Sequence, residues 1–127
     1  MLAYLDEAAH ETPVVLPLHP RTRQAAARYG LHFGAVRIVE PVGYLDMMEL
    51  LDGCTRVLTD SGGLQKEAYF FRKQCVTLRD ATEWVETIEA GWNRLWTVPH
   101  YAPRRDIDAY GDGSAAQKIA AILVSET

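Results

Sequence analysis

The sequence has few cysteines, no long apolar run and no excess of positive charge. Its two cysteines, Cys54 and Cys75, lie beside or within apolar stretches and lack the spacing of a metal site. We therefore expect both thiols to be reduced, buried and inert, as in a cytosolic protein. No apolar stretch approaches the roughly 20 residues that cross a membrane. The first residues also lack the basic region of a signal peptide. These absences predict a cytoplasmic protein that has no membrane partner.

The charge balance is mildly acidic. The 127 residues include 13 lysines and arginines against 17 aspartates and glutamates, which gives a formal net charge of −4. No basic run interrupts this balance, so the composition argues against a nucleic-acid partner. With 48% hydrophobic residues, residues 1–127 are expected to form a single domain with a modest core.

Short apolar runs alternate with segments of helical periodicity. The runs predict strands at residues 13–18, 36–39, 56–60, 74–78 and 93–96. The periodic segments predict helices at residues 21–30, closed by Gly30, at 44–53 and 62–71, and at 113–126, capped by Ser114. Strands that are apolar throughout and alternate with helices are typical of βαβ units. The sequence therefore predicts an α/β fold with one parallel sheet and helices on both faces.

Two adjacent glycines follow one of these strands, in the segment TDSGGLQKEA, residues 59–68. Ligands of parallel sheets bind beyond the carboxyl ends of the strands, and the free N–H groups of a helix's first turn attract phosphate. Ser61, Gly62 and Gly63 fall at this place. Glu67 lies one turn further along the same helix face, where it could accept from the hydroxyls of a ribose. The alternative is a capped helix whose glycines allow close packing on the strand.

Basic residues follow the first predicted strand, in LHPRTR, residues 18–23. His19, Arg21 and Arg23 could lie at the same sheet edge, and Pro20 favours a helix that starts directly after His19. Donors of this kind suit a diphosphate. The alternative is a solvated helix face with a satisfied histidine, and the spacing taken alone favours it.

A third polar segment, LRDATEWVETIEAG, spans residues 78–91. Arg79 and Asp80 come directly after a predicted strand. Glu83, Glu86 and Glu89 recur at the spacing of an exposed helix face. Acidic residues are favourable at a helix start, so this spacing does not indicate catalytic carboxylates.

Five segments resemble one known family in order and spacing. They are LPLHPRTR, VEPVGYLDMMELL, VLTDSGGLQKEAYF, CVTLRDATEWVETIEAGWNRL and YGDGSAAQKI. From about Leu2 to Leu123, the chain is similar to the C-terminal half of the non-hydrolysing UDP-N-acetylglucosamine 2-epimerases. The segment TEWVETIEAGWN resembles that of the subgroup that acts on UDP-diacetamido-uronic acids.

The resemblance implies a Rossmann-like domain, the C-terminal half of a two-domain GT-B fold, that binds UDP or a UDP-sugar. Ser61, Gly62 and Gly63 would hold the diphosphate, Glu67 the ribose hydroxyls, and Arg79 would line the cleft. His19, the candidate catalytic residue, would lie beside the diphosphate of the leaving group. Met47 stands where many relatives place an aromatic residue on uracil.

In this family the reaction inverts C2 of the sugar. UDP is eliminated to leave a 2-acetamidoglucal and is then added back with opposite stereochemistry, and the resemblance implies no metal and no cofactor. This half would stabilise the charge that develops on departing UDP. The family's catalytic carboxylates belong to the N-terminal half. We therefore expect the chain to be inactive alone and to act with a separate N-terminal half or as a homodimer.

The chain departs from the family pattern in two places. It starts after the strand that carries a THR.EN-like motif, the first strand of the Rossmann order, so the sheet is expected to close a gap, rearrange or borrow a strand. The connection between NRLW and YGDG is short, as if a helix were absent. The alternatives are a non-catalytic UDP-sugar-binding module or subunit, the C-terminal half of a GT-B glycosyltransferase, and a remnant without function.

Overall fold

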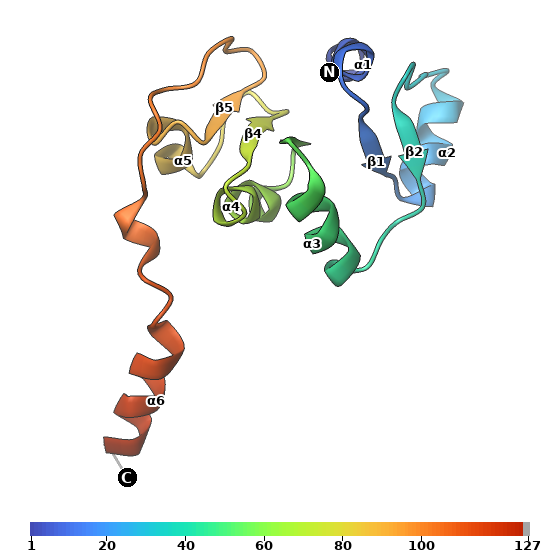
Figure 1. The fold of residues 1–127 in the computed structure, drawn as a ribbon. Helices are drawn as coiled ribbons and strands as arrows, with labels where there is room; N and C mark the ends of the chain where they lie inside the picture. The colour runs from blue at the N-terminus through green and yellow to red at the C-terminus, as the bar shows by residue number, and fades with distance from the viewer. Residues whose placement is uncertain (126–127) are drawn as a thin grey trace. The chain divides into compact units, whose positions relative to one another are not determined.

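The computed structural model describes residues 1–125. The chain divides into two compact units, which we call unit 1, Met1–Gly53, and unit 2, from Cys54 to the C-terminus. In both units parallel strands alternate with helices, as predicted for an α/β protein (Figure 1). Among the described residues, no helix is long and apolar enough to span a bilayer.

Unit 1 contains a two-stranded parallel sheet and three helices. Its elements are α1 (Leu2–Glu11), β1 (Val15–Pro17), α2 (Pro20–Arg28), β2 (Arg37–Val39) and α3 (Tyr44–Gly53). The strands pair in register from Val15 opposite Arg37 to Pro17 opposite Val39. Proline has no N–H to donate, so it is tolerated in a strand that lies at the edge of its sheet.

Two turns of unit 1 depend on glycine. Gly30 has a φ of 62° directly after α2, and its N–H donates to the Ala27 carbonyl at 3.1 Å. It therefore ends this helix as predicted. Gly34 has a φ of 59°, and the Asp6 carboxylate lies where its Cβ would be. That carboxylate accepts from the Ala35 N–H at 2.7 Å, which ties α1 to the segment before β2.

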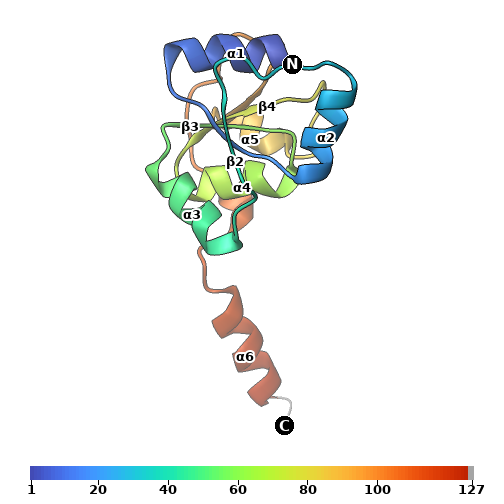
Figure 2. The same cartoon turned by 90° about the vertical axis from the view of Figure 1, so that its right-hand side faces the viewer.

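Unit 2 contains a three-stranded parallel sheet. Its elements are β3 (Arg56–Thr59), α4 (Gly62–Phe70), β4 (Gln74–Thr77), α5 (Val85–Glu89), β5 (Asn93–Leu95), the 3-10 turn η1 (Asp108–Tyr110) and α6 (Ala115–Ser125). The central strand β4 pairs with β3 on one side and with β5 on the other. α4 packs on β3 and β4, and α5 packs on β5. Figure 2 shows α4 running beside β3 and β4.

The core of unit 2 combines the central strand with an aromatic cluster. Cys75 and Val76 of β4 are at most 1% exposed. Tyr69, Trp92 and Ile107 pack together, and the rings of Tyr69 and Trp92 meet edge to face with centroids 5.7 Å apart. The Tyr69 hydroxyl also accepts from the Ile107 N–H at 2.9 Å. These contacts hold the connection between β5 and η1, which contains no helix, as its short length suggested.

Burial also sets the protonation of the two cysteine thiols. Both are free thiols, Cys75 buried and Cys54 half-buried. Desolvation raises the pKa of Cys75 to about 12 and also raises that of Cys54. The expectation of buried thiols is therefore confirmed for Cys75 and only in part for Cys54.

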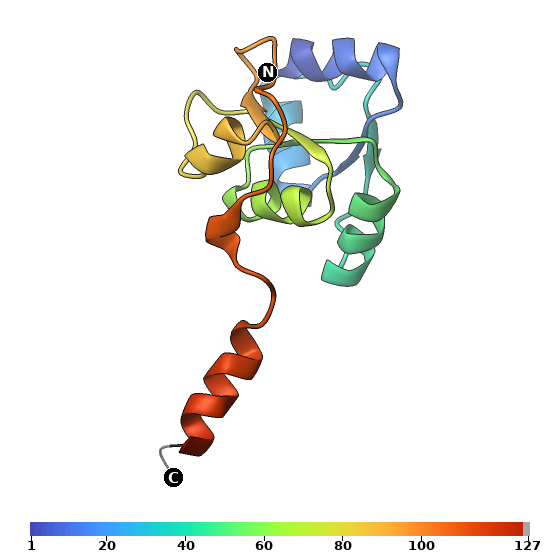
Figure 3. The ribbon, with the colours of Figure 1, turned by 60° about the vertical axis from the view of Figure 1, so that its left-hand side comes forward.

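Ser114 directly precedes α6, and its carbonyl accepts from the Lys118 N–H at 3.1 Å, so it stands at the predicted capping position. Its hydroxyl donates to the Asp112 carboxylate, and Asp112 Oδ1 also accepts from the Ser114 N–H at 3.0 Å. The predicted last helical residue, Glu126, lies outside the described residues. No residue of α6 is buried, and its ribbon extends away from the sheet of unit 2 (Figure 3).

The strands form two sheets, so the prediction of one continuous parallel sheet is wrong, whereas the α/β alternation of parallel strands with helices is confirmed. β1 and β2 form one sheet, and β3, β4 and β5 form the other. Among the described residues, no strand pairs with both sheets.

Candidate functional site

The N-terminus of α4 follows the carboxyl end of β3, where the sequence predicts an anion site. Ser61 is the N-cap residue, and its Oγ accepts from the Leu64 N–H at 3.5 Å. The Ser61 N–H in turn donates to Thr59 Oγ1 at 3.0 Å. Strand and helix are thus joined by two side-chain hydroxyls, and the predicted capping role of Ser61 is confirmed.

The two glycines at this helix start have different surroundings. A Cβ on Gly62 would lie 2.3 Å from Glu83 Oε1 and 3.4 Å from Trp84 Nε1. A Cβ on Gly63 would meet nothing nearer than Ser61 Oγ at 4.0 Å. The nearest neighbours of Gly62 thus belong to the loop before α5 and not to the strand, so they do not bear out the alternative of close packing on the strand. Gly63 has no such close neighbour.

The loop between β4 and α5 brings charge to this helix start. Arg79 Nη1 lies 3.2 Å from Glu83 Oε2, and both side chains are nearly half exposed. The Trp84 Nε1 atom is buried and has no hydrogen-bond partner among the described residues. The Glu83 carboxylate, the Arg79 guanidinium and the Trp84 N–H therefore lie near the first turn of α4.

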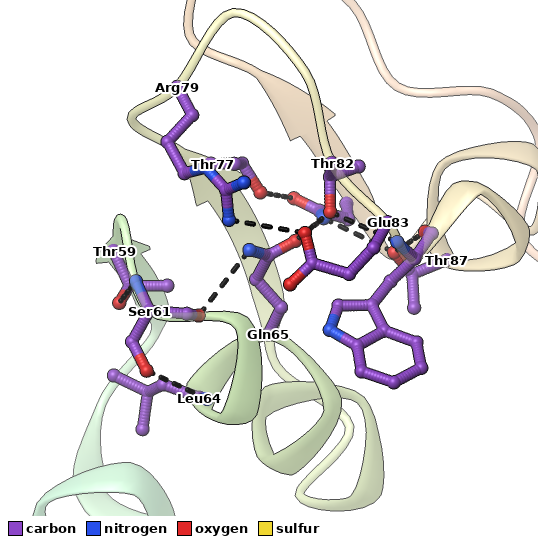
Figure 4. Close-up of polar contacts among 11 residues, drawn as sticks. Thr59, Ser61, Leu64, Gln65, Thr77, Arg79, Thr82, Glu83 and Thr87 are labelled. Atoms are coloured by element: carbon purple, nitrogen blue, oxygen red, sulfur yellow. Dashed lines mark hydrogen bonds and ion pairs between the residues drawn. The ribbon is translucent and has the colours of Figure 1, made fainter.

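Buried polar side chains connect this loop to the sheet and to α4 (Figure 4). The network consists of Gln65, Thr77, Thr82, Thr87 and Asn93. Four of its members are at most 1% exposed, with only Thr82 half-buried. Sequence reasoning missed this network. The available signal was a glutamine and an asparagine at positions of a helix and a strand that face the core.

Glu67 lies on α4, four residues after Gly63, and is half-buried. Gly63 and Glu67 thus belong to one helix, as the sequence predicts. The structure also gathers Ser61, Gly62, Gly63, Glu67 and Arg79 in unit 2. The contact of Glu67 with a ribose stays a prediction.

His19 and Met47, the other predicted site residues, belong to unit 1. His19 is the N-cap residue of α2, with Pro20 as the first helical residue, as predicted. Its Nδ1 accepts from the Arg21 N–H at 3.2 Å, which leaves Nε2 as the donor of the neutral ring. Met47 is half-buried on α3. The predicted contacts of His19 with a diphosphate and of Met47 with uracil stay predictions.

The three glutamates of the third segment each have a separate partner. Glu83 pairs with Arg79, Glu86 accepts from the Tyr110 hydroxyl at 2.8 Å, and Glu89 lies 3.9 Å from Arg105. They therefore do not form the paired carboxylates of an acid–base site. Among residues 1–125, no group of three or more potential ligands could hold a metal ion.

An open hollow of about 480 Å³ lies elsewhere in unit 2. Its lining residues come from the end of α4 and from the segment around η1 and α6, and include Tyr69, Arg72 and Asp106. None of the predicted UDP contacts lines it. The helix start of α4, not this hollow, is therefore the candidate site.

The family model and the most similar relatives agree on one family. Residues 1–124 match the family model described as UDP-N-acetylglucosamine 2-epimerase. The chain is 48% identical over 123 residues to the UDP-2,3-diacetamido-2,3-dideoxy-D-glucuronate 2-epimerase of Pseudomonas aeruginosa, in an alignment that covers 87% of this chain and 34% of that protein. It is 30% identical to the UDP-N-acetylglucosamine 2-epimerase of Escherichia coli K12, in an alignment that covers 93% of this chain and 36% of that protein. The chain thus spans about a third of the length of these relatives.

Solved structures match the fold over nearly the whole chain. The UDP-GlcNAc 2-epimerase of Methanocaldococcus jannaschii aligns with a TM-score of 0.82 and 30% identity, covering 98% of this chain and 40% of that one. A structure of the Methanocaldococcus jannaschii enzyme in complex with UDP-GlcNAc and UDP aligns with a TM-score of 0.75 and 30% identity. This alignment covers 98% of this chain and 39% of that one. The fold described above is therefore similar to part of a structure that binds UDP.

Proposed function

Because the chain belongs to the UDP-N-acetylglucosamine 2-epimerase family, we propose that it is the UDP-binding part of a UDP-sugar 2-epimerase. The diphosphate would lie at the N-terminus of α4, against Ser61 and Gly63. The observation that carries the proposal is the open space beside Gly63, where no described residue lies close enough to exclude a side chain. Free N–H groups and the helix dipole favour an anion there. The UDP bound by the Methanocaldococcus jannaschii relative supports the same ligand.

Arg79 would supply the positive charge for the diphosphate. In the free chain its guanidinium is paired with Glu83 at 3.2 Å, so the carboxylate and the ligand would compete for it. Arginine binds phosphate through parallel N–H donors, and these charge-assisted bonds are stronger than neutral ones. Glu67 would accept from the ribose hydroxyls, His19 would lie by the diphosphate, and Met47 would contact uracil.

The chemistry proposed for the whole epimerase begins with loss of the proton from C2 and of UDP from C1, which leaves the glucal. UDP then adds back to C1 and a proton to the opposite face of C2, which inverts C2. The share of this chain is electrostatic, because donors around the diphosphate stabilise the charge that develops on the leaving group. We assign no catalytic carboxylate to this chain and expect no turnover by it alone. The identity of 48% to an epimerase of a UDP-diacetamido-glucuronate favours a UDP-diacetamido-uronate as the substrate. Formation of the glucal or inversion at C2 by the isolated chain would contradict its proposed inactivity.

A calorimetric titration of the chain with UDP tests the binding proposal. Arg79→Gln should raise the Kd by about fivefold to tenfold, since it removes a charge-assisted contact. Arg105→Gln is the matched control, because Arg105 is also an exposed arginine of unit 2 beside a glutamate. Its Kd should change less than about twofold, as expected for a charge outside the site. A wild-type chain that does not bind UDP, or equal effects of the two variants, would contradict the proposal.

A further inference from the structure

We propose that Gln65 is a positioning residue for the diphosphate site, which fixes the first turn of α4 against the loop that carries Arg79 and Glu83. The inference rests on the proposed function. Gln65 is 1% exposed although it follows the capping residue Ser61 by only one helical turn. Its amide would not touch the ligand and would act through the groups that it holds.

The Gln65 amide makes three hydrogen bonds to three different segments. Its Nε2 donates to the Ser61 carbonyl at 3.3 Å. Its Oε1 accepts from Thr82 Oγ1 at 2.6 Å and from Asn93 Nδ2 at 3.1 Å. One side chain therefore connects the start of α4, the loop between β4 and α5, and β5 (Figure 4).

The network fixes the orientation of this amide. Thr82 Oγ1 accepts from the Trp84 N–H at 3.1 Å, which directs its own hydrogen to Gln65 Oε1. Rotating the Gln65 amide by half a turn would oppose its NH₂ group to Asn93 Nδ2 and its oxygen to the Ser61 carbonyl. The first contact would then face donor with donor and the second acceptor with acceptor, so only one orientation of the Gln65 amide satisfies the network.

Thr82 is the point at which Gln65 holds the loop. It directly precedes Glu83, whose carboxylate lies against Gly62 and whose partner is Arg79. The loop is thus in contact with the start of α4 twice, once through the buried amide and once through Glu83. Because an unpaired buried polar group is costly, the amide keeps the two segments together. The N–H donors of α4 and the guanidinium of Arg79 then have a fixed relative position before the ligand arrives.

Three threonine variants separate positioning from stability alone. Thr82→Val removes the hydroxyl at the loop end of the link, and Thr82→Ser restores it. Thr77→Val is the matched control, because Thr77 Oγ1 donates to Asn93 Oδ1 at 3.0 Å within the same network and so connects β4 to β5. Gln65 itself is a poorer choice, since removing its amide unpairs three buried partners at once.

Amide NMR spectra of the ligand-free chain and the Kd for UDP are the two readouts. Thr82→Val should shift the amide signals of Ser61, Gly62 and Gly63 and raise the Kd about tenfold, as small misplacements of binding groups do. Thr82→Ser should restore both, and Thr77→Val should change the Kd less than about twofold despite a similar loss of stability.

Unmoved signals of Ser61, Gly62 and Gly63 in Thr82→Val would overturn the inference, as would equal Kd changes in Thr82→Val and Thr77→Val. If the wild-type chain does not bind UDP, the proposed function fails. The shifts in the ligand-free chain still decide whether Gln65 connects the loop to α4.

Discussion

Units 1 and 2 share the same alternation of parallel strands and helices, and they differ in what holds the strands in place. In unit 2, β4 has a partner on each side, and Cys75, Val76 and Thr77 are at most 1% exposed. In unit 1, neither strand is central, and Val15 of β1 is 43% exposed. An isolated pair of strands is marginally stable at best.

The comparison teaches that the candidate site lies on the unit whose sheet has a buried central strand, although β3, the strand before the site, has a partner on one side only. Unit 2 has the central strand, the aromatic cluster and the buried polar network, and it also presents the helix start with Ser61 and Gly63. Among the described residues of unit 1, no aromatic and no polar side chain is buried. We therefore expect perturbations of unit 2 to cost more stability than equivalent perturbations of unit 1.

The largest effect is expected from Trp92→Ala in unit 2. Removing a buried tryptophan should lower the free energy of unfolding by about 3–5 kcal/mol, and it should also speed amide exchange in β4. Urea unfolding followed by circular dichroism measures the first effect. Val124→Ala, at a residue that is 75% exposed, is the control. A loss below about 1 kcal/mol for Trp92→Ala would show that the aromatic cluster does not hold unit 2.

A pair of glycines sharpens the comparison between the units. Gly91 in unit 2 has a φ of 73°, and a Cβ there would lie 2.2 Å from the Ala102 carbonyl oxygen. Gly30 in unit 1 has a φ of 62° and open space around its missing Cβ. Gly91→Ala should cost about 2–4 kcal/mol and Gly30→Ala about 1 kcal/mol, because both are strained and only the first also collides with backbone. Thermal unfolding of the two variants measures the loss of stability, and equal losses would contradict the expected difference.

Alkaline pH should destabilise unit 2. Burial raises the pKa of Cys75 from 9.0 to about 12, and burial together with the bond to Glu86 raises that of Tyr110. A raised pKa in the folded state contributes stability below the ordinary pKa, and this contribution is lost as the pH rises from 9 toward 12. The free energy of unfolding should therefore fall by about 1 kcal/mol between pH 7 and pH 10. Cys75→Ala should remove most of that fall, and an unchanged fall in this variant would exclude the thiol as its source.

The smallest effect on stability, with the clearest effect on binding, is expected from the two glycines of α4. Gly63→Ala should stabilise the free chain by up to about 0.5–1 kcal/mol, because alanine is the better helix former and has room there. It should also weaken UDP binding, because the methyl group takes the space left for the diphosphate. Gly62→Ala should displace Glu83 and disturb its pairing with Arg79. If Gly63→Ala binds UDP as tightly as the wild-type chain, that space is not used by the ligand.

The local features of the fold followed from the sequence, and the long-range ones did not. Apolar runs and capping residues located the strands, the end of α2 at Gly30 and the N-cap at Ser61, because these depend on neighbours within a few residues. The interruption of the sheet depends on strand pairing, which no local pattern specifies. For the same reason the sequence did not show that Glu83 lies against Gly62, or that Gln65 reaches Thr82.

The most direct measurement is an amide NMR titration of the 127-residue chain with UDP. The prediction is that signals of Ser61, Gly62, Gly63 and Arg79 in unit 2 move together and saturate, while those of the hollow around Arg72 and Asp106 stay in place. A dispersed spectrum that UDP leaves unchanged, or shifts confined to residues away from the start of α4, would contradict a diphosphate site at this helix.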